Sequence, residues 1–242
     1  MLSGWKPVMS GVPQGTIVGP LLFLLYINEL PKLLNSSVLL LAHDVKIWKT
    51  IRSDADRCAL QADLDELVGW CKRCLETNSN KSGIIHIGHS NYFQYSVDGT
   101  PLLPVFELKD LGVIISHDFK TSANCNGAAV KGFRVLWSIR RAFKSFDQDV
   151  FRILYSTYVR PHLEYCIQAA SLCLKKDADA LERAQRLGTK LVSDLSNLSY
   201  EEGLDQLNVF PLYYRRKRGD LILAFRVLNH DFGTDVPSFL PC

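Results

Sequence analysis

The sequence predicts an α+β fold: a first part with short strands and helices, followed by an all-helical part. Up to about residue 119, short apolar runs are separated by turn residues, which is typical of strands and hairpins. From about residue 120, apolar residues recur at helical spacing and the strand patterns stop. No internal repeat or low-complexity linker is visible. We therefore expect two parts, residues 1–119 and residues 120–242.

The composition is that of an ordinary globular protein, with 47% hydrophobic and 22% charged residues among 242. The net charge of +3 is small and unevenly distributed. Residues 1–130 carry 11 basic and 12 acidic side chains, whereas residues 131–242 carry 17 and 13. The basic excess of the second part fits contacts with phosphates, and a solvated surface explains it equally well.

Nothing in the sequence predicts secretion or a membrane span. Residues 1–10 lack the basic start and apolar core of a signal peptide. The apolar stretch at residues 17–27 is too short to cross a bilayer. The seven cysteines are scattered and odd in number, which indicates free thiols in a reducing compartment. We expect an intracellular protein of the nucleus or the cytoplasm.

The chain begins with a glycine-rich turn that leads into a helix. Residues 10–15 read Ser-Gly-Val-Pro-Gln-Gly, and Gly19 precedes Pro20. Proline is favourable in the first turn of a helix, so we expect a helix over residues 20–34. The next apolar run, residues 38–42, ends in His43-Asp44, and β-formers continue to Trp48. This pattern predicts two strands joined by a tight turn that carries an acid.

These two stretches resemble the polymerase palm of reverse transcriptases from non-LTR (LINE-like) retrotransposons. Residues 10–15 and 19–23 are similar to motif B of that family. Residues 41–44, Leu-Ala-His-Asp, stand where the family carries aromatic-Ala-Asp-Asp, its motif C. The resemblance implies a partial palm over residues 1–119, with motifs B to E, and a helical thumb and C-terminal region over residues 120–242.

The resemblance also implies an RNA-directed DNA polymerase. Its partners would be an RNA template, a DNA primer and nucleoside triphosphates, and its cofactor Mg²⁺. It assigns Asp44 to catalysis and metal binding. It assigns Pro13, Gln14 and Gly15 to the substrate side of the site.

Two departures from the family predict that this chain is catalytically inactive by itself. His43 occupies a position at which the family has a metal-binding Asp, and residues 1–43 contain no Asp. The motif A carboxylate is therefore absent, and we expect an upstream fingers and palm segment to be missing. Phosphoryl transfer by two metal ions about 3.5–4 Å apart needs several hard oxygen ligands. Asp44 alone does not supply them, so we expect Mg²⁺ not to be bound competently.

A helix is predicted over residues 53–75, with Ser53 or Asp54 as its N-cap. Beyond it, Asn78 and Lys81 match the spacing of motif D in the family. The resemblance implies that Lys81 is a general acid toward the pyrophosphate leaving group. A solvated loop lysine is the alternative.

A possible zinc pattern overlaps the end of this helix. Cys71 and Cys74 are separated by two residues, and His86 and His89 follow. The cysteine spacing is right, but the histidine spacing is shorter than zinc fingers use. Packing of the cysteines in the core is the alternative.

Short strands are expected at residues 84–87 and 92–97. Asp98-Gly99 is a strong hairpin-turn signal, with a returning strand over residues 100–108. Residues 109–115 are similar to a strand near the primer grip of the family, with Asp110 in place of the usual aromatic residue.

The second part predicts a series of helices, at residues 121–144, 148–158, from Pro161 onward, 178–195, after Ser199 and 211–229. The expected N-caps are Asp147 and Asp177, and Ser199 with Glu202 makes a capping box. In the first of these helices, the apolar residues expected on or near one face are Val130, Phe133, Leu136, Trp137 and Phe143.

Two groups of basic residues are candidate nucleic-acid contacts, Arg140 with Arg141 and the run Arg215, Arg216, Lys217 and Arg218. A basic helix start opposes the helix dipole, which suggests that these charges serve a partner. A solvated face or a nuclear-import signal are alternatives for the run. Residues 159–165, 181–186 and 215–221 also resemble blocks of the family beyond the palm.

The leading hypothesis is therefore an inactive fragment of a reverse transcriptase. A non-catalytic nucleic-acid-binding module is the first alternative, and salt-dependent binding without primer extension would identify it. A retroelement remnant with no selected function is the second, and it would neither fold nor bind.

Overall fold

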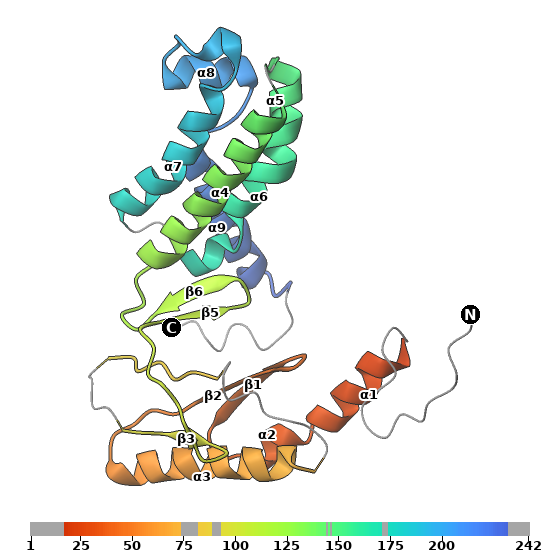
Figure 1. Cartoon of the computed structure of the whole chain (residues 1–242), viewed down its shortest axis with the longest axis vertical. Coiled ribbons are helices and arrows are strands. Elements are labelled where there is room, and N and C mark those ends of the chain that lie inside the picture. The colour runs from red at the N-terminus through yellow and green to blue at the C-terminus, as the bar shows by residue number, and fades with distance from the viewer. Residues whose placement is uncertain are drawn as a thin grey trace. The chain divides into compact units, whose positions relative to one another are not determined.

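The computed structural model describes residues 17–73, 82–88, 93–143, 145, 147–170 and 174–231. It has a mixed α/β architecture with small antiparallel sheets and several helices (Figure 1). The chain divides into two compact units, Met1–Val105 and Phe106–Cys242.

The division after Val105 differs from the boundary expected near residue 120. The hairpin of β5 (Glu107–Asp110) and β6 (Val113–Ser116) belongs to the helical unit. The Ile114 N–H donates to the side chain of Asn124 at 3.0 Å. The Tyr165 hydroxyl donates to the carbonyl of Leu111 at 2.7 Å. These bonds tie the hairpin to the helices that follow it.

The described part of the first unit begins with two helices where one was expected over residues 20–34. α1 spans Val18–Ile27 and α2 spans Leu30–Leu33. Pro31 lies in the first turn of α2. A proline inside a continuous helix would remove one hydrogen bond and clash with the preceding turn. The helix therefore ends at Ile27 and a new one begins.

The predicted hairpin forms from β1 (Ser37–Leu41) and β2 (Asp44–Trp48), which pair antiparallel. Leu41 opposes Asp44, so residues 42 and 43 make the turn, and Ala42 adopts a φ of 49°. One face of the hairpin packs on the cluster that contains Ile27, Leu30 and Trp70; the partly buried hairpin residues are Val38, Leu40, Val45 and Ile47.

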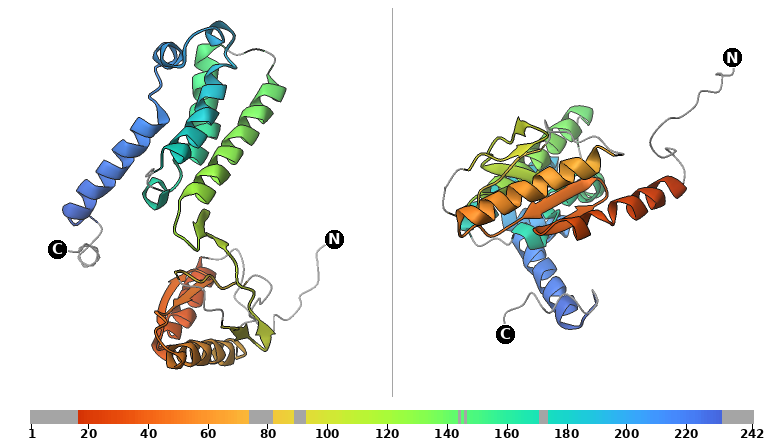
Figure 2. Two further views of the ribbon diagram at one scale, coloured as in Figure 1. Left: turned by 90° about the vertical axis from the view of Figure 1, so that its left-hand side faces the viewer. Right: turned by 90° about the horizontal axis from the view of Figure 1, so that it is seen from below.

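The predicted long helix is α3 (Asp54–Cys71), and it carries the expected N-cap. Ser53 and Asp56 form a capping box. One face of α3 packs on β3 (Ser96–Val97) and on the loop beyond β4 (Thr100–Pro101); the buried residues are Leu60, Leu64, Val68, Tyr95, Val97 and Leu102. Figure 2 shows α3 running along one side of this unit.

The other strands expected in this unit are much shorter than predicted. Asp98-Gly99 forms the predicted turn with positive φ at both residues. The returning strand, however, ends at Pro101, and Ile84 makes only a single bridge to Pro104. Proline has no N–H to donate, so it cannot continue a ladder. In the second unit, Leu111 and Gly112, which were expected inside one strand, are instead the turn between β5 and β6.

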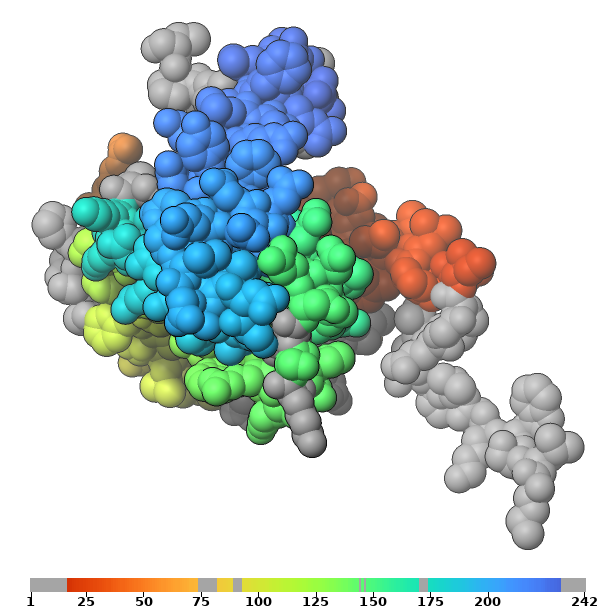
Figure 3. Space-filling model, turned by 90° about the horizontal axis from the view of Figure 1, so that it is seen from above, coloured from red at the N-terminus to blue at the C-terminus, as the bar shows by residue number. Residues whose placement is uncertain are grey.

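The described part of the second unit contains the β5–β6 hairpin and a helical array (Figures 1 and 2). The helical segments are α4 Ser122–Ala142, α5 Gln148–Leu154, the π-helix η2 Tyr155–Val159, α6 Arg160–Glu164, η3 Ile167–Ala170, α7 Lys175–Thr189, η4 Ser193–Leu195, α8 Tyr200–Leu207 and α9 Leu212–Leu228. Gln148 on α5 donates to Gln206 on α8 at 3.5 Å, and the space-filling view shows the two helices against each other (Figure 3).

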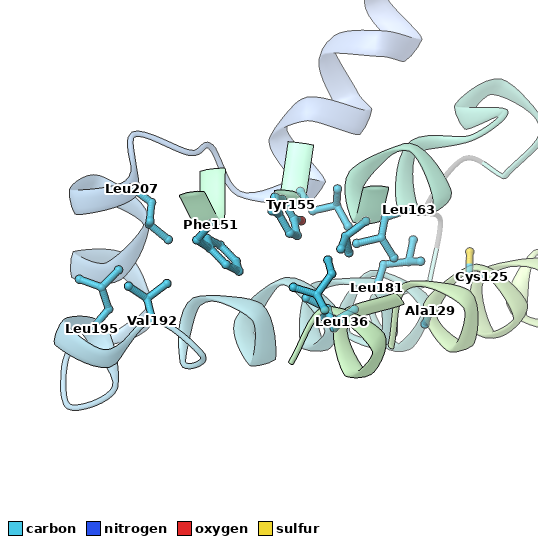
Figure 4. Close-up of a cluster of buried hydrophobic side chains, with 14 residues drawn as sticks. Cys125, Ala129, Leu136, Phe151, Tyr155, Leu163, Leu181, Val192, Leu195 and Leu207 are labelled. Atoms are coloured by element: carbon cyan, nitrogen blue, oxygen red, sulfur yellow. The ribbon is translucent and has the colours of Figure 1, made fainter. Parts of the chain in front are cut away.

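The core of this unit lies where α4, α7 and the helices around η2 meet (Figure 4). It contains Leu136, Phe151, Tyr155, Leu163, Leu181 and Leu207 among other residues that are at most 8% exposed. The Tyr155 hydroxyl donates to Gln185 at 2.7 Å, and the Gln185 amide donates to the carbonyl of Phe210 at 3.0 Å. The buried hydroxyl of Tyr155 and the buried amide of Gln185 therefore both have partners, as a stable interior requires.

Three expected helix starts have different outcomes. Asp147 caps α5 and accepts from the Val150 N–H at 2.7 Å, as predicted. Ser199 and Glu202 form the predicted capping box of α8. Asp177 does not cap α7: it lies inside the first turn, is 2% exposed, and accepts from the Thr121 hydroxyl at 2.9 Å. α7 also ends at Thr189, earlier than expected.

α7 also organises the start of α9. The Glu182 carboxylate accepts from the backbone N–H groups of Leu212 and Tyr213, at 3.2 and 3.3 Å. It also accepts from the Tyr200 hydroxyl of α8. The free N–H groups of a helix start need such acceptors. Burial and this hydrogen bond raise the pKa of Tyr200.

The buried face of α4 is not the one expected from its largest apolar residues. Its buried residues are Cys125, Ala129, Gly132, Leu136 and Ile139. Val130, Trp137 and Phe143 are 46%, 48% and 42% exposed. Small residues on the buried face allow α6 to approach closely, because a Cβ at Gly132 would stand 2.8 Å from a methyl group of Leu163.

We expect Gly132→Ala to destabilise the protein by roughly 1–2 kcal/mol, because Leu163 is fully buried and cannot move aside without repacking. Gly69→Ala on α3 is the matched control, since no atom lies within 4 Å of its Cβ position. Alanine there should stabilise the helix by about 0.5–1 kcal/mol. Urea unfolding followed by far-UV circular dichroism compares the two. Equal effects would contradict the close approach at Gly132.

Candidate functional site

The predicted catalytic carboxylate lies at the tip of the β1–β2 hairpin. Asp44 is the first residue of β2 and directly follows the turn. The Nε2 atom of His43 lies 3.8 Å from a carboxylate oxygen of Asp44. Their side chains are 86% and 57% exposed, so both groups face solvent. The hairpin therefore presents one carboxylate and one imidazole side by side.

This donor set does not fit a pair of Mg²⁺ ions. Within the described residues, no group of three or more His, Cys, Asp or Glu side chains is arranged to hold a metal. Magnesium needs near-octahedral oxygen coordination, and an imidazole nitrogen is a poor ligand for it. Asp44 and His43 can therefore contribute to a metal site only together with further carboxylates.

Several predicted site residues lie outside the described part of the chain. These are Pro13, Gln14 and Gly15 on the substrate side and the candidate general acid Lys81. Cys74 and His89 of the possible zinc pattern also lie outside it. Cys71 is 8% exposed and packs beside Trp70. Burial raises the pKa of the Cys71 thiol, which disfavours the thiolate that zinc requires.

The residue that holds the hairpin in place was not recognised in the sequence. Asp63 on α3 is 2% exposed and accepts from the backbone N–H groups of Asn35 and Ser36, at 3.0 and 2.8 Å. It also accepts from the Ser36 hydroxyl. These donors directly precede β1. The signal available in the sequence was helical spacing, because Asp63 stands between the inward-facing Leu60 and Leu64.

The basic run at the start of α9 is divided between the interior and the surface. Arg215 forms an ion pair with Glu164. Arg216 is 3% exposed and donates to the carbonyl of Leu163 at 2.7 Å. Only Lys217 and Arg218 are exposed. The structure therefore exposes two of the four residues expected to contact a nucleic acid, and the contact itself stays a prediction.

The other predicted basic pair is exposed. Arg140 and Arg141 lie in the last turn of α4. The guanidinium of Arg140 lies 5.1 Å from the ring centre of Trp137, within the range of a cation–π contact. Neither arginine has a carboxylate within ion-pair distance in the described part of the chain.

A cavity of about 380 Å³ lies beside α4, and nothing in the sequence predicted it. Its walls come from the β5–β6 turn, α4 and α6, and include Gly112, Asn124, Lys131, His162 and Tyr165. The close approach of Tyr165 to Gly112 shapes one wall, since a Cβ at Gly112 would meet the Tyr165 ring at 3.2 Å.

Across the described residues, every helix is too short or too polar to cross a lipid bilayer. Comparisons of the chain with models of known protein families, with curated proteins and with solved structures returned no match.

Proposed function

We propose that the chain is a segment of the reverse transcriptase of a non-LTR retrotransposon, covering part of a palm and a thumb. The observation that carries this proposal is the β1–β2 hairpin, in which Asp44 directly follows a two-residue turn and Leu41 opposes it. A tight hairpin with a carboxylate at its tip is the arrangement that the resemblance of residues 41–44 implies. The helical second unit after it supports the same order of elements.

The reaction class of such an enzyme is in-line attack of a primer 3′-hydroxyl on the α-phosphate of a nucleotide, with pyrophosphate leaving. Stabilising that transfer requires a set of carboxylates that positions the metal ions. Asp44 is one carboxylate, and His43 beside it is not an equivalent ligand. The chain by itself therefore does not extend a primer.

The activity that remains is to hold an RNA–DNA hybrid by its phosphates. Arg140, Arg141, Lys217 and Arg218 are the predicted basic residues that are exposed for this role. Contacts between such cations and phosphates release counterions, so binding weakens as salt rises. This part of the proposal concerns the backbone of the hybrid and involves no reading of sequence.

A primer-extension assay on an RNA template, with Mg²⁺ and then Mn²⁺, tests the first part, and a binding assay with the RNA–DNA hybrid at several salt concentrations tests the second. We expect no nucleotide addition by the chain. We expect hybrid binding that falls on the order of 100-fold between about 50 and about 200 mM salt if four phosphates are contacted. Asp44→Ala and the control Glu66→Ala, an exposed acid of α3, should bind as the chain does.

Two results would contradict this. Extension by the chain that Asp44→Ala abolishes and Glu66→Ala retains would show a competent metal site and overturn the inactive assignment. A chain that folds but does not bind the hybrid even at low salt would overturn the reverse transcriptase assignment for this segment.

A further inference from the structure

We propose that the exposed face of α4 binds single-stranded nucleic acid, with Trp137 as the ring on which an unpaired base stacks. This proposal rests on the proposed function, since it adds a second substrate form to the same helical unit. Trp137 and its neighbours Lys131 and Arg134 were not among the predicted contacts.

The residues of this face share one side of the helix. Arg134, Trp137 and Arg141 are at positions i, i+3 and i+7, which lie above one another on a helix. All three are exposed, while Leu136 and Ile139 on the opposite side are in the core. At a rise of about 1.5 Å per residue, the three span roughly 10 Å along the axis. The face therefore presents a cation, a ring and a cation in line.

The charge of this region is one-sided. Residues 119–146 contain no Asp or Glu; their basic residues are Lys120, which pairs with Asp118 just before this range, and Lys131, Arg134, Arg140, Arg141 and Lys144. On α4 itself, none of the four cations lies within ion-pair distance of a carboxylate in the part of the chain that the structure describes. A solvated helix usually mixes both signs of charge. A run of cations without acids is complementary to a polyanion.

The exposed ring of Trp137 favours binding of a single strand over binding of a duplex. Trp137 is 48% exposed and does not belong to the core cluster of its unit. The Arg140 guanidinium lies over the ring, 5.1 Å from its centre, and places a positive charge beside it. Bases stack on such aromatic surfaces in proteins that bind single strands. In a duplex the base faces are already occupied by neighbouring bases, so the ring gains nothing there.

Binding of the full chain to a 16-nucleotide oligo(dT), to oligo(U) and to an abasic strand of the same length tests the proposal. We expect Trp137→Ala to weaken binding of oligo(dT) or oligo(U) by about 5- to 150-fold. Trp137→Phe retains a ring and should restore most of the affinity. Neither change should alter binding of the abasic strand or of the RNA–DNA hybrid. The first two strands distinguish DNA from RNA as the preferred form.

Trp48→Ala is the matched control, because Trp48 is 53% exposed but lies on β2 in the other unit. It should leave all three affinities unchanged. The double substitution Arg134→Ala with Arg141→Ala should weaken binding of the abasic strand as well. Arg152→Ala, which removes an exposed arginine of α5, should leave that binding unchanged.

The outcomes separate this proposal from the proposed function. The stacking role is wrong if Trp137→Ala lowers the affinity for the single strand no more than Trp48→Ala does. It is also wrong if Trp137→Ala lowers the affinity for the hybrid as much as that for the single strand. In both cases the proposed binding of the hybrid is unaffected. If the chain binds the single strand through Trp137 but never binds the hybrid, the proposed function fails and this inference stands. If the folded chain binds no nucleic acid, both are wrong.

Discussion

Asp63→Ala is expected to lower the free energy of unfolding of the first unit by about 3–4 kcal/mol. The Asp63 carboxylate is the acceptor for two backbone N–H groups and one hydroxyl, from Asn35 and Ser36. Each buried donor that loses its acceptor costs about 1–3 kcal/mol. Ser36 is itself only 7% exposed, so water cannot replace the carboxylate easily.

The same bond set makes this stability depend on pH. Burial by itself raises the pKa of Asp63, but the hydrogen bonds from Ser36 and Asn35 outweigh it, so the pKa lies below its ordinary value. A depressed folded-state pKa contributes stability above the unfolded pKa of about 3.9. That contribution is lost as the pH falls through the folded-state pKa. The difference between the chain and Asp63→Ala should therefore be constant near neutral pH and shrink below about pH 4.

Urea unfolding followed by tryptophan fluorescence measures this effect. Trp70 reports on the first unit, because it is 3% exposed and stacks on Tyr26 with ring centres 4.7 Å apart. Glu66→Ala, three residues further along α3 and exposed, is the control and should change stability by less than about 0.5 kcal/mol. A similar loss in both variants would contradict the role assigned to Asp63.

Arg216→Ala is expected to destabilise the second unit by about 3 kcal/mol. Arg216 is buried, and its guanidinium satisfies the carbonyl of Leu163 at 2.7 Å. The substitution removes this donor and leaves a cavity between α9 and α6, and each effect contributes on the order of 1–3 kcal/mol. Lys217→Ala, one residue further and exposed, should change stability by less than about 0.5 kcal/mol.

Arg216→Ala should have the larger effect on stability, whereas Lys217→Ala should have the larger effect on nucleic-acid binding. At a temperature where both are folded, Arg216→Ala should keep the affinity of the chain for an RNA–DNA hybrid, whereas Lys217→Ala should reduce its salt dependence. Thermal unfolding and filter binding on the same samples give both quantities. A stable Arg216→Ala protein with weakened binding would mean that Arg216 reaches the nucleic acid after all.

Local patterns in the sequence predicted the elements whose causes are local. The β1–β2 hairpin follows from an apolar run and a turn, and the N-caps Ser53, Asp147 and Ser199 follow from short-range hydrogen bonds. The single helix over residues 20–34 was wrong because the effect of Pro31 outweighed the apolar pattern around it.

The parts that the sequence did not predict depend on contacts between distant segments. Asp63 binds residues 27 and 28 positions away, and Asp177 binds a residue 56 positions away. The buried Arg216 donates to a carbonyl 53 positions away. From the sequence alone, an acidic residue or a basic run is assigned to the solvated surface, because its distant partner is not known. Likewise, the face of α4 that is buried is the one where Gly132 lets Leu163 of α6 approach closely. It is not the face with the largest apolar side chains.

For the candidate site, the sequence predicted an acid at the tip of the hairpin, where Asp44 lies, and six basic contact residues, of which Arg140, Arg141, Lys217 and Arg218 are exposed. It did not predict the hydrogen bonds of Asp63 to the residues before β1, the cavity beside α4 or the exposed ring of Trp137. All three arise from how helices pack, and periodicity alone does not determine that.

The bonds from Glu182 to α8 and to the start of α9 make the stability of the first turn of α9 depend on α7. The first turn of α9 has its N–H groups satisfied by a side chain of α7, so it gains that stabilisation only after α7 has formed. α9 also follows α7 along the chain and leaves the ribosome after it. We therefore expect α9 to form last in the helical unit, against helices that are already in place.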